Sequence, residues 1–242
     1  MVAPSFPIDF DYPVIAGCLR RLGFEIVVEV SVGAQETNRQ LLELLKLYPD
    51  KRLITAPCPT VVRLIRHKYP ELVPYLAIID SPMSATAKVI LKQFPGLKPV
   101  FIGPCLAKKL EAKEDRSDLG ILVLTYAELK QVFKAKNIQP ETKDKEASFD
   151  ITGLPTRLYP VSGGLAQSAG LNELLTDEEY DVVSSHQLVE KALQAFRENT
   201  KLRVLDILYC DGGCLNGPGT NRTLSLEQRR QKIISHWAKG VK

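Results

Sequence analysis

The sequence predicts an α/β protein of two lobes, in which mainly parallel sheets are flanked by helices. Short apolar runs rich in Val, Ile and Leu alternate with amphipathic segments of helical length, which is typical of parallel strands covered by helices on both faces. The composition also fits, because 242 residues with 45% hydrophobic and 25% charged side chains can bury a core of one large or two small lobes.

The expected elements fall into two groups, before and after Cys105. Strands of a first sheet are predicted at Val2–Phe6, Glu25–Val30, Arg52–Ala56 and Pro99–Gly103, with helices between them at Pro13–Leu22, Ala34–Leu47 and Thr60–Tyr69. Further strands are predicted at Gly120–Thr125, Asp181–Ser185 and Arg203–Leu208. We therefore expect one domain over 1–242, with lobe one at about 1–105, lobe two at about 106–220 and a terminal helix over 224–238. The polar stretch 137–156 is predicted to be an exposed connection.

Charge and hydropathy exclude several classes of partner. The net charge of +4 is spread along the chain without a basic stripe, so no nucleic-acid partner is expected. No apolar run approaches the roughly 20 residues of a membrane span, and the first residues lack a signal-peptide pattern. We therefore expect no membrane association and a cytoplasmic location, where five cysteines are poor evidence for disulfides.

Four of the cysteines fall where a metal site is expected. Cys58, Cys105 and Cys210 each follow an apolar strand, and Cys214 lies four residues beyond Cys210. Ligands of parallel α/β sheets collect beyond the carboxyl ends of the strands, so these thiols are predicted to meet in a cleft between the lobes. Four thiolates select an iron-sulfur cluster or zinc over oxygen-loving cations.

Two simpler interpretations remain open at this point. Any single cysteine can be a small buried hydrophobe, and we expect this for Cys18, which lies on the apolar side of a predicted helix. Structural zinc usually uses close CxxC pairs, whereas here one CxxxC pair accompanies two distant cysteines. Spacing alone does not decide between zinc and an iron-sulfur cluster.

Three further blocks of sequence surround these cysteines: TAPCPTVVRLIRHKYPEL at Thr55–Leu72, GPCLAKKLEA at Gly103–Ala112 and CDGGCLNGPG at Cys210–Gly219. In this order they resemble the motifs TSCCPGWVxxxExxxPEL, MPCxAKKxEA and CPGGCxNGGG of the catalytic, or H-cluster, domain of the FeFe-hydrogenase large subunit. Shorter matches occur in the right order at APS, SPM and VSGG. The likeness extends over nearly the whole chain and is nearest to the divergent, sensory members.

The resemblance implies a cofactor and a set of residues that hold it. In the family, the cysteines that match Cys58, Cys105, Cys210 and Cys214 bind a 4Fe-4S cluster. The one assigned here to Cys214 also bridges to a diiron subcluster with carbonyl, cyanide and dithiolate ligands. Lys108 is expected to act as the catalytic lysine that hydrogen-bonds a cyanide, and Ala3, Pro4 and Ser5 to contact the other side of the diiron unit.

The chain departs from catalytic members where protons are delivered. Pro57 replaces the proton-donating cysteine, Gly103 replaces a methionine beside the diiron site, and the acidic relay residues align with Arg39 and Gln40. A positioned acid is worth roughly 10² to 10⁴ in rate, so turnover is expected to be slow.

The resemblance therefore implies a dihydrogen sensor or a weak oxidoreductase that oxidises dihydrogen or reduces protons. Its protein partners would be ferredoxin-type domains or proteins, maturation factors and fused signalling domains. The alternative is a non-catalytic module of structural or regulatory role that binds only a 4Fe-4S cluster or zinc.

Overall fold

The structure is a computed structural model that describes residues 11–220 and 223–240. The predicted strand Val2–Phe6, and with it Ala3, Pro4 and Ser5, lies outside the described residues. No helix in the described ranges is both long and apolar enough to cross a membrane.

The described chain alternates strands and helices, as the fold class requires. The strands are β1 (Leu53–Ile54), β2 (Val100–Gly103), β3 (Leu122–Thr125), β4 (Tyr180–Ser184) and β5 (Val204–Leu208). The helices are α1 (Tyr12–Arg21), α2 (Ser31–Leu47), α3 (Pro59–Lys68), α4 (Pro82–Gln93), α5 (Ala107–Leu110), α6 (Tyr126–Ala135), α7 (Gly164–Ser168), α8 (Leu171–Leu174), α9 (Val189–Glu198) and α10 (Leu226–Ala238). Most predicted helices and strands within the described residues occur close to their expected places. The prediction of a strand at Glu25–Val30 is wrong, because this segment forms only an isolated parallel bridge between Val28 and Ile151.

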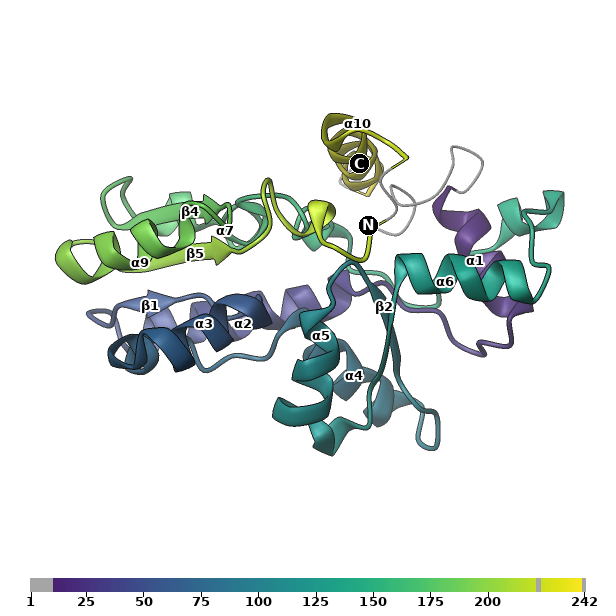
Figure 1. The fold of residues 1–242 in the computed structure, drawn as a ribbon, viewed down its shortest axis with the longest axis horizontal. Coiled ribbons are helices and arrows are strands. Elements are labelled where there is room, and N and C mark those ends of the chain that lie inside the picture. The colour runs from purple at the N-terminus through teal and green to yellow at the C-terminus, as the bar shows by residue number, and fades with distance from the viewer. Residues whose placement is uncertain (1–10, 221–222, 241–242) are drawn as a thin grey trace.

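Two parallel sheets are present among the described strands. One has the order β1-β5-β4, with Leu53 opposite Val204 and Tyr180 opposite Val204 on the other side. The other pairs β2 with β3, with Val100 opposite Leu122 and Gly103 opposite Thr125. Figure 1 shows β4 and β5 on the left, β2 near the middle and α1 with α6 on the right.

The membership of the sheets differs from the prediction. Each described sheet combines strands from both sides of Cys105, because β1 pairs with β5 and β2 pairs with β3. The expectation that Arg52–Ala56 and Pro99–Gly103 share a first sheet is therefore wrong for the described strands. The hydrophobic pattern identifies a strand but not its neighbour, since buried parallel strands all present similar apolar runs. The lobe boundaries themselves stay a prediction.

Helices cover both faces of each sheet. Leu205 and Ile207 of β5 pack with α3 and α9, whereas Val204 packs with α2, α7 and α8. In the smaller sheet, Ile102 packs with α1 and α6, and its neighbour Phe101 packs with Met83 of α4. Successive strand residues point to opposite faces, so helices can pack on both faces of each sheet. Burial is complete for β5, whereas β2 is mostly half-buried.

One detail of the prediction needs correction. The stretch 137–156 is not simply an exposed connection, because a 3₁₀ turn at Thr142–Glu146 packs on α1 and buries Asp144. Asp144 accepts hydrogen bonds from Cys18 and Arg21, which explains how a polar segment can lie against a helix. Cys18 itself is fully buried in α1, as expected.

Candidate metal centre

Cys58 follows β1 and begins α3. Its backbone is extended, with φ −95° and ψ 106°, so it occupies the N-cap position, and Pro59 forms the first turn of the helix. Proline suits that position because its missing N–H would have no helical partner. Cys58 is buried beside the hydrophobic residues between α3 and β5.

Cys105 follows β2 through Pro104 and is half-buried. Burial raises the pKa of its thiol, and the charge of Cys58 also raises it. Against this, the Lys108 ammonium and the backbone N–H groups of Lys108 and Ala107 favour the thiolate. The first turn of α5 therefore supplies positive electrostatic potential to this sulfur.

Cys210 and Cys214 lie in the loop after β5, and glycines give that loop its shape. Gly212 and Gly213 have φ of 74° and 107°, values that favour glycine. A Cβ on Gly213 would lie 2.5 Å from the carbonyl oxygen of Pro160, so this loop passes directly over the 160–162 backbone. Both cysteines are half-buried.

The same loop continues to the smaller sheet. Gly219 donates its N–H to the carbonyl oxygen of Pro104 at 2.7 Å, and a Cβ on Gly219 would lie 2.7 Å from Cβ of Thr125. Gly217 also lies against Pro104. The loop that carries Cys214 is therefore packed against Pro104, the residue before Cys105. This contact connects the carboxyl end of β5 with that of β2, which belongs to the other sheet.

The four predicted thiols influence one another electrostatically. Burial and then the charges of Cys58, Cys105 and Cys210 raise the pKa of the Cys214 thiol well above its usual range, and Lys108 acts in the opposite direction. Charge effects of this kind fall with distance. Removing the protons of these thiols would be unfavourable unless a cation compensated, so a metal held by them would bind as they lose their protons.

The described part of the chain offers no preformed site for a single metal ion. Among its His, Cys, Asp and Glu side chains, no group of three or more has the arrangement to hold such an ion.

Lys108 lies within this group and is held in place on two sides. Its ammonium is buried, lies 2.5 Å from Oε2 of Glu111 and donates to the carbonyl oxygen of Pro57 at 3.2 Å. The other oxygen of Glu111 accepts a hydrogen bond from Ser81, the N-cap residue of α4. Sequence reasoning missed Glu111, although its i+3 spacing from Lys108 was a signal of a helical ion pair.

The expected relay positions do not supply an acid beside the cysteines. Pro57 is buried and Gly103 lies against the Phe101 ring, while Arg39 is exposed and paired with Glu36 and Glu43. Gln40 instead hydrogen-bonds Asp80, a buried carboxylate. Burial alone would raise the pKa of Asp80, but hydrogen bonds from Lys88, Gln40 and Arg116 hold it below its ordinary value.

Two histidines lie in different surroundings. His186 is half-exposed and hydrogen-bonded to Asp211 at 3.0 Å. His236 is half-buried: it stacks on Tyr12 and lies 3.1 Å from Glu29, which also pairs with Arg157. The pattern of α10 alone could not reveal this contact, because Glu29 is 207 residues away in the chain.

The donor set fits an iron-sulfur cluster. Four soft sulfur donors, backbone N–H groups aimed at one of them and a buried ammonium nearby together suit an anionic sulfur-rich group. The Ala3–Ser5 side of a diiron site lies outside the described residues, so only Lys108 bears on that unit.

Comparison with solved structures identifies proteins of similar fold. A variant of the [FeFe]-hydrogenase HydA1 of Chlamydomonas reinhardtii superposes with a TM-score of 0.64 and 20% sequence identity, over 95% of this chain and 78% of that chain. At this identity the likeness concerns the fold alone. The prediction of an α/β fold with parallel sheets flanked by helices is confirmed.

Sequence comparisons identify relatives of two kinds. The chain is 25% identical over 275 residues to a Caenorhabditis elegans protein named "Probable cytosolic Fe-S cluster assembly factor oxy-4", with 91% of this chain and 60% of that protein covered. It is 24% identical over 253 residues to iron hydrogenase 1 of Clostridium pasteurianum, with 83% and 44% covered. The chain thus spans about half the length of these curated relatives.

A family model settles the affiliation of the chain. Residues 1–218 match the model of the iron only hydrogenase large subunit, C-terminal domain, which is most of the chain and includes all four predicted cysteine positions. The chain therefore belongs to the family of the iron only hydrogenase large subunit, C-terminal domain.

Proposed function

We propose that this domain holds a 4Fe-4S cluster on Cys58, Cys105, Cys210 and Cys214. The observation that carries the proposal is where the cysteines lie: Cys58, Cys105 and Cys210 follow the ends of β1, β2 and β5 in two sheets. The loop that carries Cys214 is hydrogen-bonded to Pro104, the residue before Cys105, through the Gly219 N–H. A cluster held there would replace the protons of the thiols and relieve their repulsion.

The same geometry argues against efficient dihydrogen turnover. Pro57 occupies the position of the proton-donating thiol, and its side chain has no proton to give. Its carbonyl oxygen is engaged by Lys108, and Lys108 is neutralised by Glu111. We therefore assign the domain to cytosolic iron-sulfur handling rather than hydrogenase catalysis, as for the relatives whose names describe cytosolic cluster assembly.

Dihydrogen sensing or slow turnover is the second candidate. It is favoured by one residue, Lys108, which matches the family's cyanide-binding lysine and whose ammonium is buried beside the carbonyl oxygen of Pro57. If a diiron subcluster is installed, it supplies the dihydrogen chemistry, and Lys108 would hold and orient it. Maturation factors would then be required partners.

Anaerobic reconstitution with iron and sulfide tests the first proposal. We expect about four iron and four sulfide per chain, and an electron paramagnetic resonance signal of a reduced 4Fe-4S cluster. Zinc at one ion per chain, with no retained sulfide, would contradict it and support the zinc alternative.

Coexpression with hydrogenase maturation factors separates the two roles. Infrared bands of bound carbonyl and cyanide would establish a diiron subcluster and favour the sensing candidate. Their absence from a sample that contains the full 4Fe-4S complement supports the assembly-type role.

A further inference from the structure

Helix α10 packs on the loop that carries Cys214, although it lies beyond the residues that match the family model. That match ends at residue 218, whereas α10 spans Leu226–Ala238. Figure 1 shows α10 at the top of the view, between the side of β4 and the side of α6. The contacts of α10 with the cysteine loop therefore come from a helix outside the matched domain.

The turn that begins at Cys214 is short and depends on outside partners. Cys214–Asn216 forms one 3₁₀ turn, in which the Gly217 N–H donates to the Cys214 carbonyl oxygen at 2.9 Å. A single turn is marginal by itself, and its last carbonyl groups have no partner within it. The Leu215 carbonyl oxygen is one of these groups.

Arg229 of α10 donates hydrogen bonds to this turn. Its guanidinium donates to the carbonyl oxygen of Leu215 at 2.6 Å and to Oδ1 of Asn216 at 3.1 Å. It also donates to the hydroxyl oxygen of Thr220 at 3.3 Å, where the same loop continues. Arg229 is only 3% exposed, so water competes little for these charge-assisted hydrogen bonds.

An apolar contact accompanies these hydrogen bonds. Ile233 is buried together with Leu158, Val161 and Leu215. Arg229 and Ile233 are four positions apart, so they lie on the same face of α10. That face of the helix therefore holds the residue after Cys214 both through its backbone and through its side chain.

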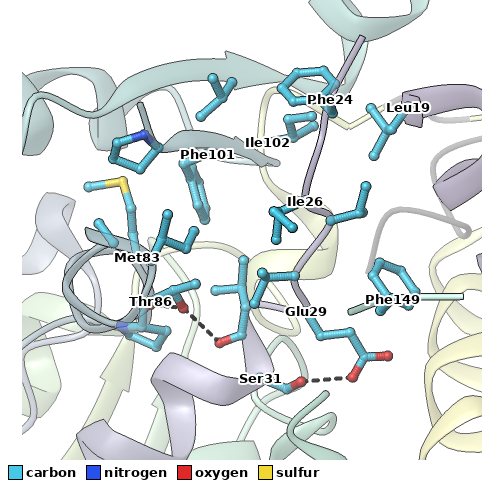
Figure 2. Close-up of a pocket in the computed structure, with 18 of the residues that line it drawn as sticks. Leu19, Phe24, Ile26, Glu29, Ser31, Met83, Thr86, Phe101, Ile102 and Phe149 are labelled. Carbon is cyan, nitrogen blue, oxygen red and sulfur yellow. Dashed lines mark hydrogen bonds between the residues drawn. The ribbon is translucent and has the colours of Figure 1, made fainter. Parts of the chain in front are cut away.

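The other end of α10 is fixed to a different part of the molecule. Nε2 of His236 lies 3.1 Å from Oε1 of Glu29, and Arg157 donates to the His236 carbonyl oxygen at 3.1 Å. Figure 2 shows Glu29 with the hydrogen bond that it accepts from Ser31. Glu29 also pairs with Arg157 at 2.8 Å. The helix is thus held independently of the cysteine loop, and Arg229 acts on the loop from a fixed position.

We infer that Arg229 is a positioning residue of the candidate metal centre, and that through it α10 holds the Cys214 turn ready for ligation. Arg229 acts through Leu215 and Asn216 and not on the metal itself. A turn that is already ordered loses less conformational freedom when its thiol binds a cluster. The ligand role of Cys214 rests on the proposed function, but the contacts of Arg229 are present without any metal.

Amide exchange of the unmodified, metal-free chain, followed by nuclear magnetic resonance, tests whether α10 holds the turn. If it does, the turn opens whenever α10 detaches. The Leu215 and Gly217 amides should therefore be protected relative to an unstructured peptide, but no more strongly than the Ile233 amide of α10. Exchange of the two loop amides at the rate of a free peptide, or stronger protection than that of Ile233, would overturn the inference.

Arg229→Met and Arg230→Met form a matched pair, because Arg230 is the next residue of α10 and is exposed. Arg229→Met should speed exchange of the Leu215 and Gly217 amides by about 10-fold or more, the factor that one hydrogen bond from a charged donor is worth. The Ile207 amide in the buried strand β5 should keep its rate, and Arg230→Met should change none of the three. Equal acceleration at Ile207 would show a general loss of stability and count against a positioning role.

Reconstituted protein supplies the readout that concerns the metal. A chelator should remove iron from Arg229→Met about 10-fold faster than from the wild type. Arg229→Lys should restore part of the difference, because it keeps the charge and a donor. An unchanged rate in Arg229→Met would overturn the inference. Wild-type protein that takes up no 4Fe-4S cluster would instead contradict the proposed function, and amide exchange would still decide whether α10 holds the turn.

Discussion

The ammonium of Lys108 lies 3.2 Å from the carbonyl oxygen of Pro57 and donates a hydrogen bond to it. Pro57 precedes Cys58, and Lys108 follows Cys105 by one helical turn. The contact therefore ties together two cysteine-bearing loops from different sheets. Glu111 completes the arrangement as a buried counter-ion.

Replacing Lys108 with methionine is expected to destabilise the metal-free protein by about 3 to 5 kcal/mol, because it leaves Glu111 buried without its partner. The double variant Lys108→Met/Glu111→Met should recover much of this loss. Chemical denaturation measures both. A double variant as unstable as the single one would show that the ion pair is not the cause.

Gly213→Ala is expected to destabilise the loop of Cys210 and Cys214, since its Cβ would lie 2.5 Å from the Pro160 carbonyl oxygen. Gly23→Ala is a suitable control, because Gly23 has a similar φ of 103° but nothing within 4 Å of the added Cβ. Both variants carry the backbone strain of about 1 to 2 kcal/mol. If Gly213→Ala loses more stability and more iron than Gly23→Ala, the difference is due to the close approach of Gly213 to Pro160. Equal losses in the two variants would contradict this explanation.

Much of the fold followed from the sequence, and the exceptions share a physical cause. The patterns of α1 and α3 and the strand positions before Cys58, Cys105 and Cys210 depend on neighbours in sequence, which are visible in the chain. The pairing of β1 with β5, the Glu29–His236 contact and the burial of Asp144 depend on residues more than 100 positions apart. Local propensity carries no information about such contacts.

Asp206 is expected to make stability depend on pH. Burial in β5 raises its pKa from 3.8 to about 6, although Ala166 and Thr55 donate hydrogen bonds to it. The folded protein then binds more protons than the unfolded chain between about pH 4 and 6, so stability falls as pH rises through that window. The loss attributable to this group is about 3 kcal/mol.

Denaturation of the wild type and Asp206→Asn at several pH values measures this effect. The variant should remove the decline between about pH 4 and 6. Asp181→Asn, at an exposed position of β4, controls for the removal of an aspartate. A decline that persists in Asp206→Asn would assign it to another group.

Pro57→Cys is expected to raise dihydrogen turnover in protein that carries a diiron subcluster, by up to roughly 10² to 10⁴. Pro57→Ala removes the ring without supplying a thiol and should stay as slow as the wild type. The full gain is not expected, since Arg39 is paired with glutamates and Gln40 with Asp80 instead of forming an acidic relay. Wild-type protein that turns over as fast as the cysteine variant would refute the role assigned to Pro57.

The iron and sulfide content of a cysteine panel tests the central claim most directly. Alanine variants of Cys58, Cys105, Cys210 and Cys214 are reconstituted beside Cys18→Ala, whose thiol is buried in α1 with Asp144 as its partner. We expect each of the four to lose most of the cluster and its spectroscopic signal, while Cys18→Ala keeps the full complement. Full iron and sulfide in any of the four variants, or their loss in Cys18→Ala, would contradict the assignment.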